Sequence, residues 1–141
     1  MVKRVSEAQW QGDLKSGSGS VALGSGAFKG PYSYKSRFED GSGTNPEELL
    51  GAAHAACFSM ALSLALAQAG HPPTQVHTRA TVSFGPVPNG FAISRIELQT
   101  EGKVPGVDAA TFQKFASEAK ANCPVSKALA SVEITLSAKL L

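Results

Sequence analysis

The chain has 141 residues, the size of one compact domain that can bury a core without disulfides or a metal. Its 13 basic and 11 acidic residues give a formal net charge of +2 without a basic run, which argues against nucleic acid as a partner. The hydrophobic fraction of 43% excludes a disordered chain. The cationic start has no apolar signal core, so we expect a single domain over residues 1–141, located in the cytoplasm.

The N-terminal part alternates apolar and polar residues, as strands do. Residues 5–10 and 14–23 predict a hairpin, and the aromatic–polar alternation over residues 32–38 predicts a third strand. The glycine- and serine-rich run over residues 16–26 is not a phosphate loop, because no Gly-Lys-Ser/Thr ending follows it. We interpret this run as a flexible strand edge or loop.

A long helix is predicted to begin at Asn45-Pro46-Glu47-Glu48. Asn45 can cap it, Pro46 suits the first helical position, and two acidic residues in the first turn complement the helix dipole. The helix should run to about Ala69, before a glycine and two prolines. It is apolar on nearly every side.

A helix of about 24 residues is about 36 Å long, close to the diameter of a compact domain of this size. A membrane span is the alternative, but the alanine content, His54 and Gln68 favour a buried core helix. One subunit can hardly cover such a helix. We therefore expect a homodimer in which the partner shields the exposed face.

The second half of the chain predicts another hairpin, two helices and a last strand. Residues 76–84 and 91–100 alternate around a turn rich in glycine and proline. Asp108 can cap a helix, Pro124 can start a second, short one, and residues 132–136 form a strand. The order of elements predicts an α+β fold with antiparallel sheets wrapped around a long central helix.

The chain has two cysteines, which could be either reactive thiols or ordinary core residues. Their spacing fits neither a redox CxxC pair nor a zinc finger, and a static disulfide is not expected in a reducing compartment. Cys123 precedes Pro124 at a helix start, where free N–H groups and the dipole can lower a thiol pKa. Cys57 lies inside the long helix, where burial would raise its pKa unless a cation is brought to it. From residue type alone, a core thiol that packs the alanine-rich helix is the favoured interpretation of Cys57.

His54 and Cys57 share a helix face at i, i+3, which suits half of a metal site or a Cys–His nucleophile pair. A metal needs more ligands than this spacing supplies, and His71 and His77 could join only through the fold. A core or interface histidine is the commoner outcome, so we expect no metal and no cofactor. Arg37 could turn its guanidinium toward the long helix or form a surface salt bridge.

Residues 43–62, together with Asn122-Cys123-Pro124-Val125-Ser126, resemble the OsmC/Ohr family of thiol peroxidases. The resemblance is to the OsmC branch, because His54 stands where the Ohr branch more often has a tyrosine. It extends over the whole chain, through residues 10–13, 36–39 and 104–108.

The resemblance implies a role for four residues. Cys57 matches the peroxidatic cysteine, Cys123 the resolving one, Arg37 the arginine that holds the thiolate, and Glu47 the glutamate that orients this arginine. It also implies an α+β fold and an intertwined homodimer with its sites at the subunit interface. The substrate would be an organic hydroperoxide, and a thiol or a dithiol such as a lipoyl group would be the reductant.

The chemistry is coherent: a thiolate attacks a peroxide oxygen, becomes a sulfenic acid, and is closed into a disulfide by the second thiol. Glu47 is harder to place, because it lies about 15 Å along the helix from Cys57. A break in the helix, or Arg37 from the other subunit, would relax this constraint. An apolar lining of Phe58, Met60 and Ala61 would favour organic hydroperoxides over hydrogen peroxide.

Two alternatives stay open from the sequence. One is a Cys–His hydrolase or acyl transferase that uses Cys57 as nucleophile and His54 as base. The other is a non-enzymatic ligand-binding dimer whose cysteines are inert parts of the core.

Overall fold

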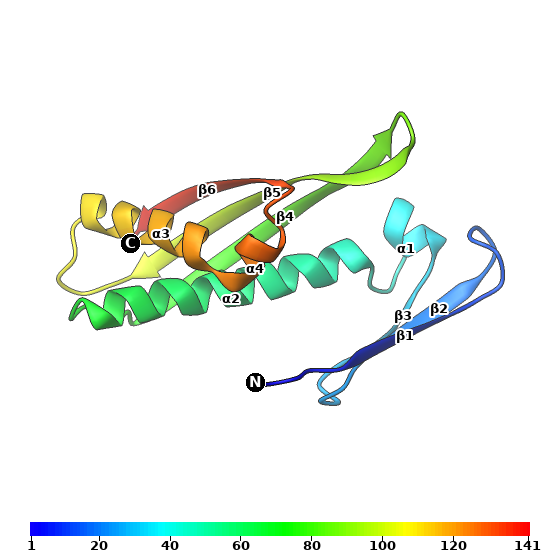
Figure 1. Ribbon diagram of the computed structural model, residues 1–141, viewed down its shortest axis with the longest axis horizontal. Coiled ribbons are helices and arrows are strands. Elements are labelled where there is room, and N and C mark those ends of the chain that lie inside the picture. Colours follow the sequence, from blue (N-terminus) through cyan, green and yellow to red (C-terminus); the bar gives the residue numbers. More distant parts are fainter. The chain divides into compact units, whose positions relative to one another are not determined.

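The computed structural model describes all 141 residues, which form two compact units, Met1–Leu49 and Leu50–Leu141 (Figure 1). The first unit holds a three-stranded sheet, a short helix and the start of a long helix. The second holds most of the long helix, another three-stranded sheet and two further helices. The expected α+β fold class is confirmed.

The first sheet is antiparallel, in the order β1 (Ser6–Gln11), β2 (Ser18–Leu23) and β3 (Lys29–Tyr32). The predicted N-terminal hairpin is confirmed, but its second strand begins later than expected. Asp13 explains the difference, because its carboxylate accepts hydrogen bonds from the backbone N–H and the hydroxyl of Ser16, at 2.7 and 2.6 Å. These bonds hold residues 13–16 in a turn, so the strand starts only after it.

The strand predicted over residues 32–38 is wrong beyond Tyr32, because Tyr34–Phe38 forms a short helix, α1. Ser33 and Ser36 make a reciprocal capping box, in which each hydroxyl accepts from the backbone N–H of the other. This local bonding outweighs the aromatic–polar alternation. Arg37 therefore lies in the last turn of a helix rather than at the end of a strand.

The long helix α2 runs without a break over Pro46–Gln68, as predicted. The Asn45 side chain accepts from the backbone N–H of Glu48 at 2.7 Å, which confirms the expected cap. At the other end Gly70 has φ 87°, and the N–H of His71 reaches back to the carbonyl of Leu66 at 2.8 Å. This is a Schellman ending, which needs a residue that tolerates positive φ.

The second sheet pairs β4 (Gln75–Val87) with β5 (Gly90–Lys103) in an antiparallel hairpin whose strands are longer than predicted. β6 (Glu133–Leu140) runs parallel to β5, which corrects the expectation of purely antiparallel sheets. The chain crosses from β5 to β6 through two helices, and such a connection returns the strand in the same direction. These helices are α3 (Ala109–Asn122), capped by Asp108, and α4 (Pro124–Ala128).

Within the second unit α2 runs along one face of the sheet (Figure 1). Ser59 on α2 donates a hydrogen bond to the Thr78 hydroxyl of β4 at 2.8 Å. The inward stripe recurs every three or four residues and is buried, and it consists of Gly51, His54, Phe58, Leu62 and Leu66. Phe58, Leu62 and Leu66 join one core with Ile96 and Leu98 of β5 and with Phe112, Ala116 and Ala119 of α3.

The other side of α2 is apolar and open in the single chain. Met60 is 75% and Leu64 is 59% exposed. By length and composition alone α2 could cross a membrane, with a mean hydropathy of 1.8, a property that core helices of soluble proteins share. The expectation that this helix is buried all round is therefore not met by one chain.

Candidate active site

An ion pair joins Arg37 and Glu47 in the first unit. Arg37 Nη2 lies 2.8 Å from Glu47 Oε1, and Nε donates to both carboxylate oxygens at 3.2 Å. α1 positions the arginine and the first turn of α2 the glutamate. The Glu47 side chain is 8% exposed and that of Arg37 is 33% exposed. The carboxylate thus fixes one edge of a guanidinium that still reaches the surface.

The two cysteines form the second pair, in the second unit. Both are free thiols, with Cys57 on α2 and Cys123 at the N-cap of α4. Cys57 packs against the core cluster that contains Cys123, and each thiol shifts the pKa of the other. Cys123 is fully buried, whereas Cys57 is only half-buried. The fold therefore brings together two thiols that lie far apart in the sequence.

The surroundings shift the pKa values of the two thiols in opposite directions. Burial raises the pKa of Cys57, and the hydrogen bond to Cys123 raises it further, while a hydrogen bond from the Val125 N–H acts against both. Burial also acts to raise the pKa of Cys123, but hydrogen bonds from Cys57, Ser126 and the Val125 N–H outweigh it and lower that pKa. Both directions match the sequence-based expectation.

The start of α4 provides these hydrogen bonds. Pro124 occupies its first turn and no side chain caps it, so the N–H groups of Val125 and Ser126 have no partner within the helix. Both groups act to lower the pKa of Cys123. The Cys-Pro-Val-Ser segment therefore places two amides and one hydroxyl at the buried thiol.

His54 is not paired with Cys57. Its Nε2 lies 2.7 Å from the Ser126 hydroxyl, and its buried Nδ1 has no hydrogen-bond partner. Its side chain is fully buried, and burial lowers its pKa. The Cys57–His54 nucleophile–base pair that a hydrolase needs is thus not formed. Sequence reasoning did not find Ser126 as the partner of His54, because the two are 72 residues apart.

A groove of about 840 Å³ opens beside Cys57 in the second unit. It lies between α2 and the C-terminal half of α3, and Pro124 of α4 also lines it. Met60 and Ala61 line it, as predicted, but Phe58 does not, because it is fully buried in the core. The lining residues are Ala53, Ala56, Cys57, Met60, Ala61, Leu64, Ala65, Gln68, Glu118, Ala119, Asn122 and Pro124. Half-buried Cys57 thus opens into a largely apolar groove.

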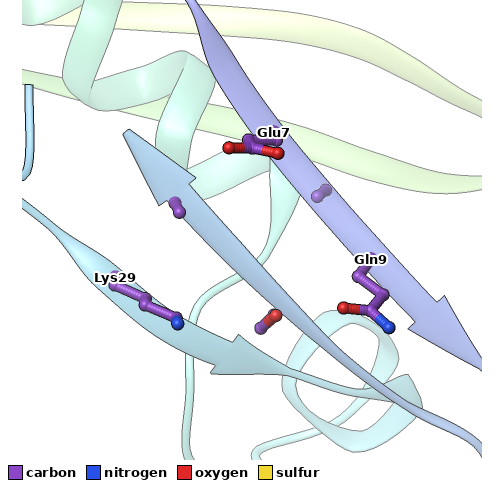
Figure 2. A pocket seen from close by; sticks show the side chains of 6 residues that line it. Glu7, Gln9 and Lys29 are labelled. Atoms are coloured by element: carbon purple, nitrogen blue, oxygen red, sulfur yellow. The ribbon is translucent and has the colours of Figure 1, made fainter. Parts of the chain in front are cut away.

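A separate hollow of about 190 Å³ lies on the sheet of the first unit. Figure 2 shows Glu7 and Gln9 on β1 and Lys29 on β3 at this place. Its lining has no cysteine or histidine. Nowhere in the chain do three or more His, Cys, Asp or Glu side chains group in a way that could hold a metal ion.

Comparison with known proteins identifies the family. Residues 39–137 match the model of the family described as OsmC-like protein. The chain belongs to the OsmC-like family. It is 52% identical over 140 residues to the peroxiredoxin OsmC of Escherichia coli (strain K12), covering 99% of this chain and 97% of that protein.

Other relatives come from the organic hydroperoxide resistance proteins. The one from Xanthomonas axonopodis pv. citri is 39% identical over 98 residues, 68% of this chain and 67% of its own length. The crystal structure of OhrB of Bacillus subtilis superposes with a TM-score of 0.76 at 24% identity, covering 96% of this chain and 98% of that one. At 24% identity this structural similarity shows that the chain and OhrB share a fold.

Proposed function

We propose that this protein is a cysteine-based peroxidase that reduces organic hydroperoxides, and hydrogen peroxide more weakly, in oxidative stress defence. Membership of the OsmC-like family supports a peroxide-reducing activity. The relatives named peroxiredoxin and organic hydroperoxide resistance protein support the substrate class. The apolar groove beside Cys57 supports the preference for organic peroxides, because an alkyl or aryl group gains free energy there and a small polar peroxide does not.

Cys57 is the proposed peroxidatic residue and Cys123 the resolving one. The Cys57 thiolate attacks the terminal oxygen of ROOH, the O–O bond breaks, and the alcohol leaves with a proton, so that Cys57 becomes a sulfenic acid. Cys123 then attacks the Cys57 sulfur, the S–O bond breaks, and water leaves. Two thiols, or one dithiol such as a lipoyl group, return the disulfide to two cysteines.

The single observation that carries this assignment is that two free thiols meet in one core cluster, where Cys57 packs against the buried set that contains Cys123 and also opens into the groove. A chain that used its cysteines only as core thiols would not need the amides and the hydroxyl of α4 aimed at one of them.

Arg37 is proposed to stabilise the Cys57 thiolate and the negative charge on the departing oxygen, and Glu47 to orient Arg37. The raised pKa of Cys57 supports the need for such a cation. The ion pair between Arg37 and Glu47 supports the orienting role. Since α2 has no break between Glu47 and Cys57, the arginine must be extended or come from the partner subunit.

We further propose that the whole chain acts as one OsmC-like domain and forms a homodimer in the cytoplasm. The exposed apolar side of α2 supports the homodimer, because a second copy would cover Met60 and Leu64. The free thiols are compatible with a reducing compartment.

Mass spectrometry after one equivalent of cumene hydroperoxide tests the assignment. The wild type should gain an intramolecular Cys57–Cys123 disulfide, Cys123→Ser should accumulate oxidised Cys57, and Cys57→Ser should stay unmodified. Unchanged masses in all three proteins would favour the non-enzymatic binding dimer. Turnover that is lost only in His54→Ala would point to a histidine-dependent reaction instead.

A further inference from the structure

The buried pair of His54 and Ser126 ends at the sulfur of Cys123. His54 Nε2 lies 2.7 Å from Ser126 Oγ, and Ser126 is the third residue of α4, whose N-cap is Cys123, so the Ser126 and Cys123 side chains lie beside each other at the helix start. His54 and Cys123 are fully buried, and Ser126 is 6% exposed. The three side chains therefore form a line of polar atoms inside the core, from α2 to the start of α4.

The unpartnered Nδ1 of His54 sets the direction of this line. A neutral imidazole carries one proton, and a buried N–H without an acceptor is costly and rare. A proton on Nδ1 would leave a buried N–H without an acceptor. A proton on Nε2 is instead donated to the Ser126 oxygen, so the second tautomer is favoured. Ser126 then has its single hydroxyl proton free to donate to the Cys123 sulfur.

A hydroxyl that donates to sulfur favours the thiolate over the thiol. The groups around Cys123 include the Cys57 thiol on α2, the Ser126 hydroxyl and the N–H groups on α4, and His54 behind Ser126. Glu118 on α3 lines the groove at the same end of the molecule. Hydrogen bonds that act on the pKa of Cys57 come from Cys123 and Val125, and Ser126 is not among them. The line therefore acts directly on Cys123, and it reaches Cys57 only through Cys123.

We propose that Ser126 and His54 activate Cys123 for disulfide closure and leave the cleavage of the peroxide unaffected. Ser126 and His54 are positioning residues of this step, because Ser126 lies beside the reacting Cys123 at the start of α4 and His54 acts through Ser126. In the step, Cys123 attacks the sulfenic sulfur of Cys57, the S–O bond breaks, and the oxygen leaves as water with the proton that Cys123 has given up. This inference rests on the proposed roles of the two cysteines.

Two matched pairs of variants test it. Ser126→Ala removes the hydroxyl, while Ser126→Thr keeps it. His54→Leu removes the donor, while His54→Gln keeps an amide N–H at the place of Nε2. Stopped-flow fluorescence with cumene hydroperoxide separates the second-order oxidation of Cys57 from the first-order closure of the disulfide, and trapping with dimedone followed by mass spectrometry measures the sulfenic acid.

In Ser126→Ala and His54→Leu we expect closure to slow about tenfold or more, with its pH midpoint moved up by about one pH unit. Oxidation of Cys57 should stay within about twofold of wild type, and excess peroxide should drive more Cys57 to sulfinic acid. Ser126→Thr and His54→Gln should restore both the rate and the pH midpoint of closure.

Unchanged closure and an unchanged pH midpoint in Ser126→Ala and His54→Leu would overturn the inference. An equal loss of oxidation and closure would do so too, since that points to a structural role. If one pair does not fold, the other gives the same comparison. A wild type that forms neither sulfenic acid nor disulfide would instead refute the proposed function itself.

Discussion

Arg37 and Glu47 are joined by a two-pronged ion pair, with Nη2 2.8 Å from Oε1 and Nε 3.2 Å from both oxygens. This geometry suits a planar guanidinium and not a lysine ammonium. The carboxylate is almost fully buried, so the pair is screened less than a surface salt bridge. The first prediction concerns this pair.

Arg37→Met should slow the oxidation of Cys57 by about a hundredfold, because the thiolate and the departing oxygen lose their cation. Arg37→Lys should recover little of this loss. Arg95 provides the control, since it pairs with Glu97 at 3.4 Å with both side chains more than 40% exposed. Arg95→Met should oxidise Cys57 at the wild-type rate in stopped-flow measurements, and an equal rate in Arg37→Met would remove Arg37 from the mechanism.

The apolar groove predicts an order of substrates. The value of kcat/KM should be highest for cumene hydroperoxide, lower for tert-butyl hydroperoxide and lowest for hydrogen peroxide, because the apolar area that each can bury decreases in this order. Initial rates for the three peroxides, measured with one reductant at a fixed concentration, give these kcat/KM values. A clear preference for hydrogen peroxide would contradict the proposed substrate class.

The exposed side of α2 predicts how the chain assembles. Leu64→Glu places a charge on this side and should shift the protein from dimer to monomer, which light scattering after gel filtration measures. Leu141→Glu is a matched control, because Leu141 is 57% and Leu64 59% exposed. If both variants stay dimeric, or if the wild type is a monomer, α2 is not the interface.

His54 predicts a loss of stability in mild acid. Burial holds its pKa below the ordinary 6.5, so the unfolded chain takes up a proton below about pH 6.5 that the folded chain does not. The free energy of unfolding should be at its full value above that pH and should fall as the pH decreases below it. Asp13 and Asp108, whose pKa values are lowered from 3.8 chiefly by side-chain hydrogen bonds to Ser16 and Thr111, contribute only in stronger acid.

Urea unfolding at about pH 7.5 and about pH 5.5 measures this effect. The drop between the two pH values should be smaller in His54→Gln than in the wild type. An identical drop in both proteins would mean that His54 is not kept neutral by the fold.

The Asn45 cap gives a prediction that is independent of function. Asn45 accepts from the Glu48 N–H at 2.7 Å and donates to the Ser36 carbonyl at 3.0 Å. Asn45→Ala loses both bonds and should lower the free energy of unfolding by about 1–2 kcal/mol. Asn45→Asp keeps the acceptor and should lose less. Chemical denaturation ranks the three proteins, and a neutral Asn45→Ala would show that the cap contributes little.

The parts of the fold that depend on neighbouring residues were predictable. The caps at Asn45 and Asp108 each follow from a few adjacent residues, whereas the lowered pKa of Cys123 depends on Cys57 as well as on the residues that follow Pro124. The helix at Tyr34–Phe38 was missed because the aromatic–polar alternation suggested a strand. The reciprocal Ser33–Ser36 bonds that start this helix leave a weaker signal in the sequence than the alternation does.

Features that need tertiary structure were not predictable. The parallel direction of β6 depends on where α3 and α4 return the chain, and burial of Phe58 depends on which stripe of α2 faces the sheet. The bond from His54 to Ser126 joins two elements with no shared pattern. Family resemblance pointed to the cysteines, Arg37 and Glu47, but not to this bond.

If the proposed disulfide forms, the unequal burial of the two cysteines determines which of the two sulfur atoms a reductant attacks. Cys57 opens into the groove, while Cys123 has no exposed surface. An incoming reductant can therefore reach only the Cys57 sulfur, and the mixed disulfide must form there. Cys123 is then expelled as the leaving group, and the hydrogen bonds at the start of α4 that lower its pKa make it a good one.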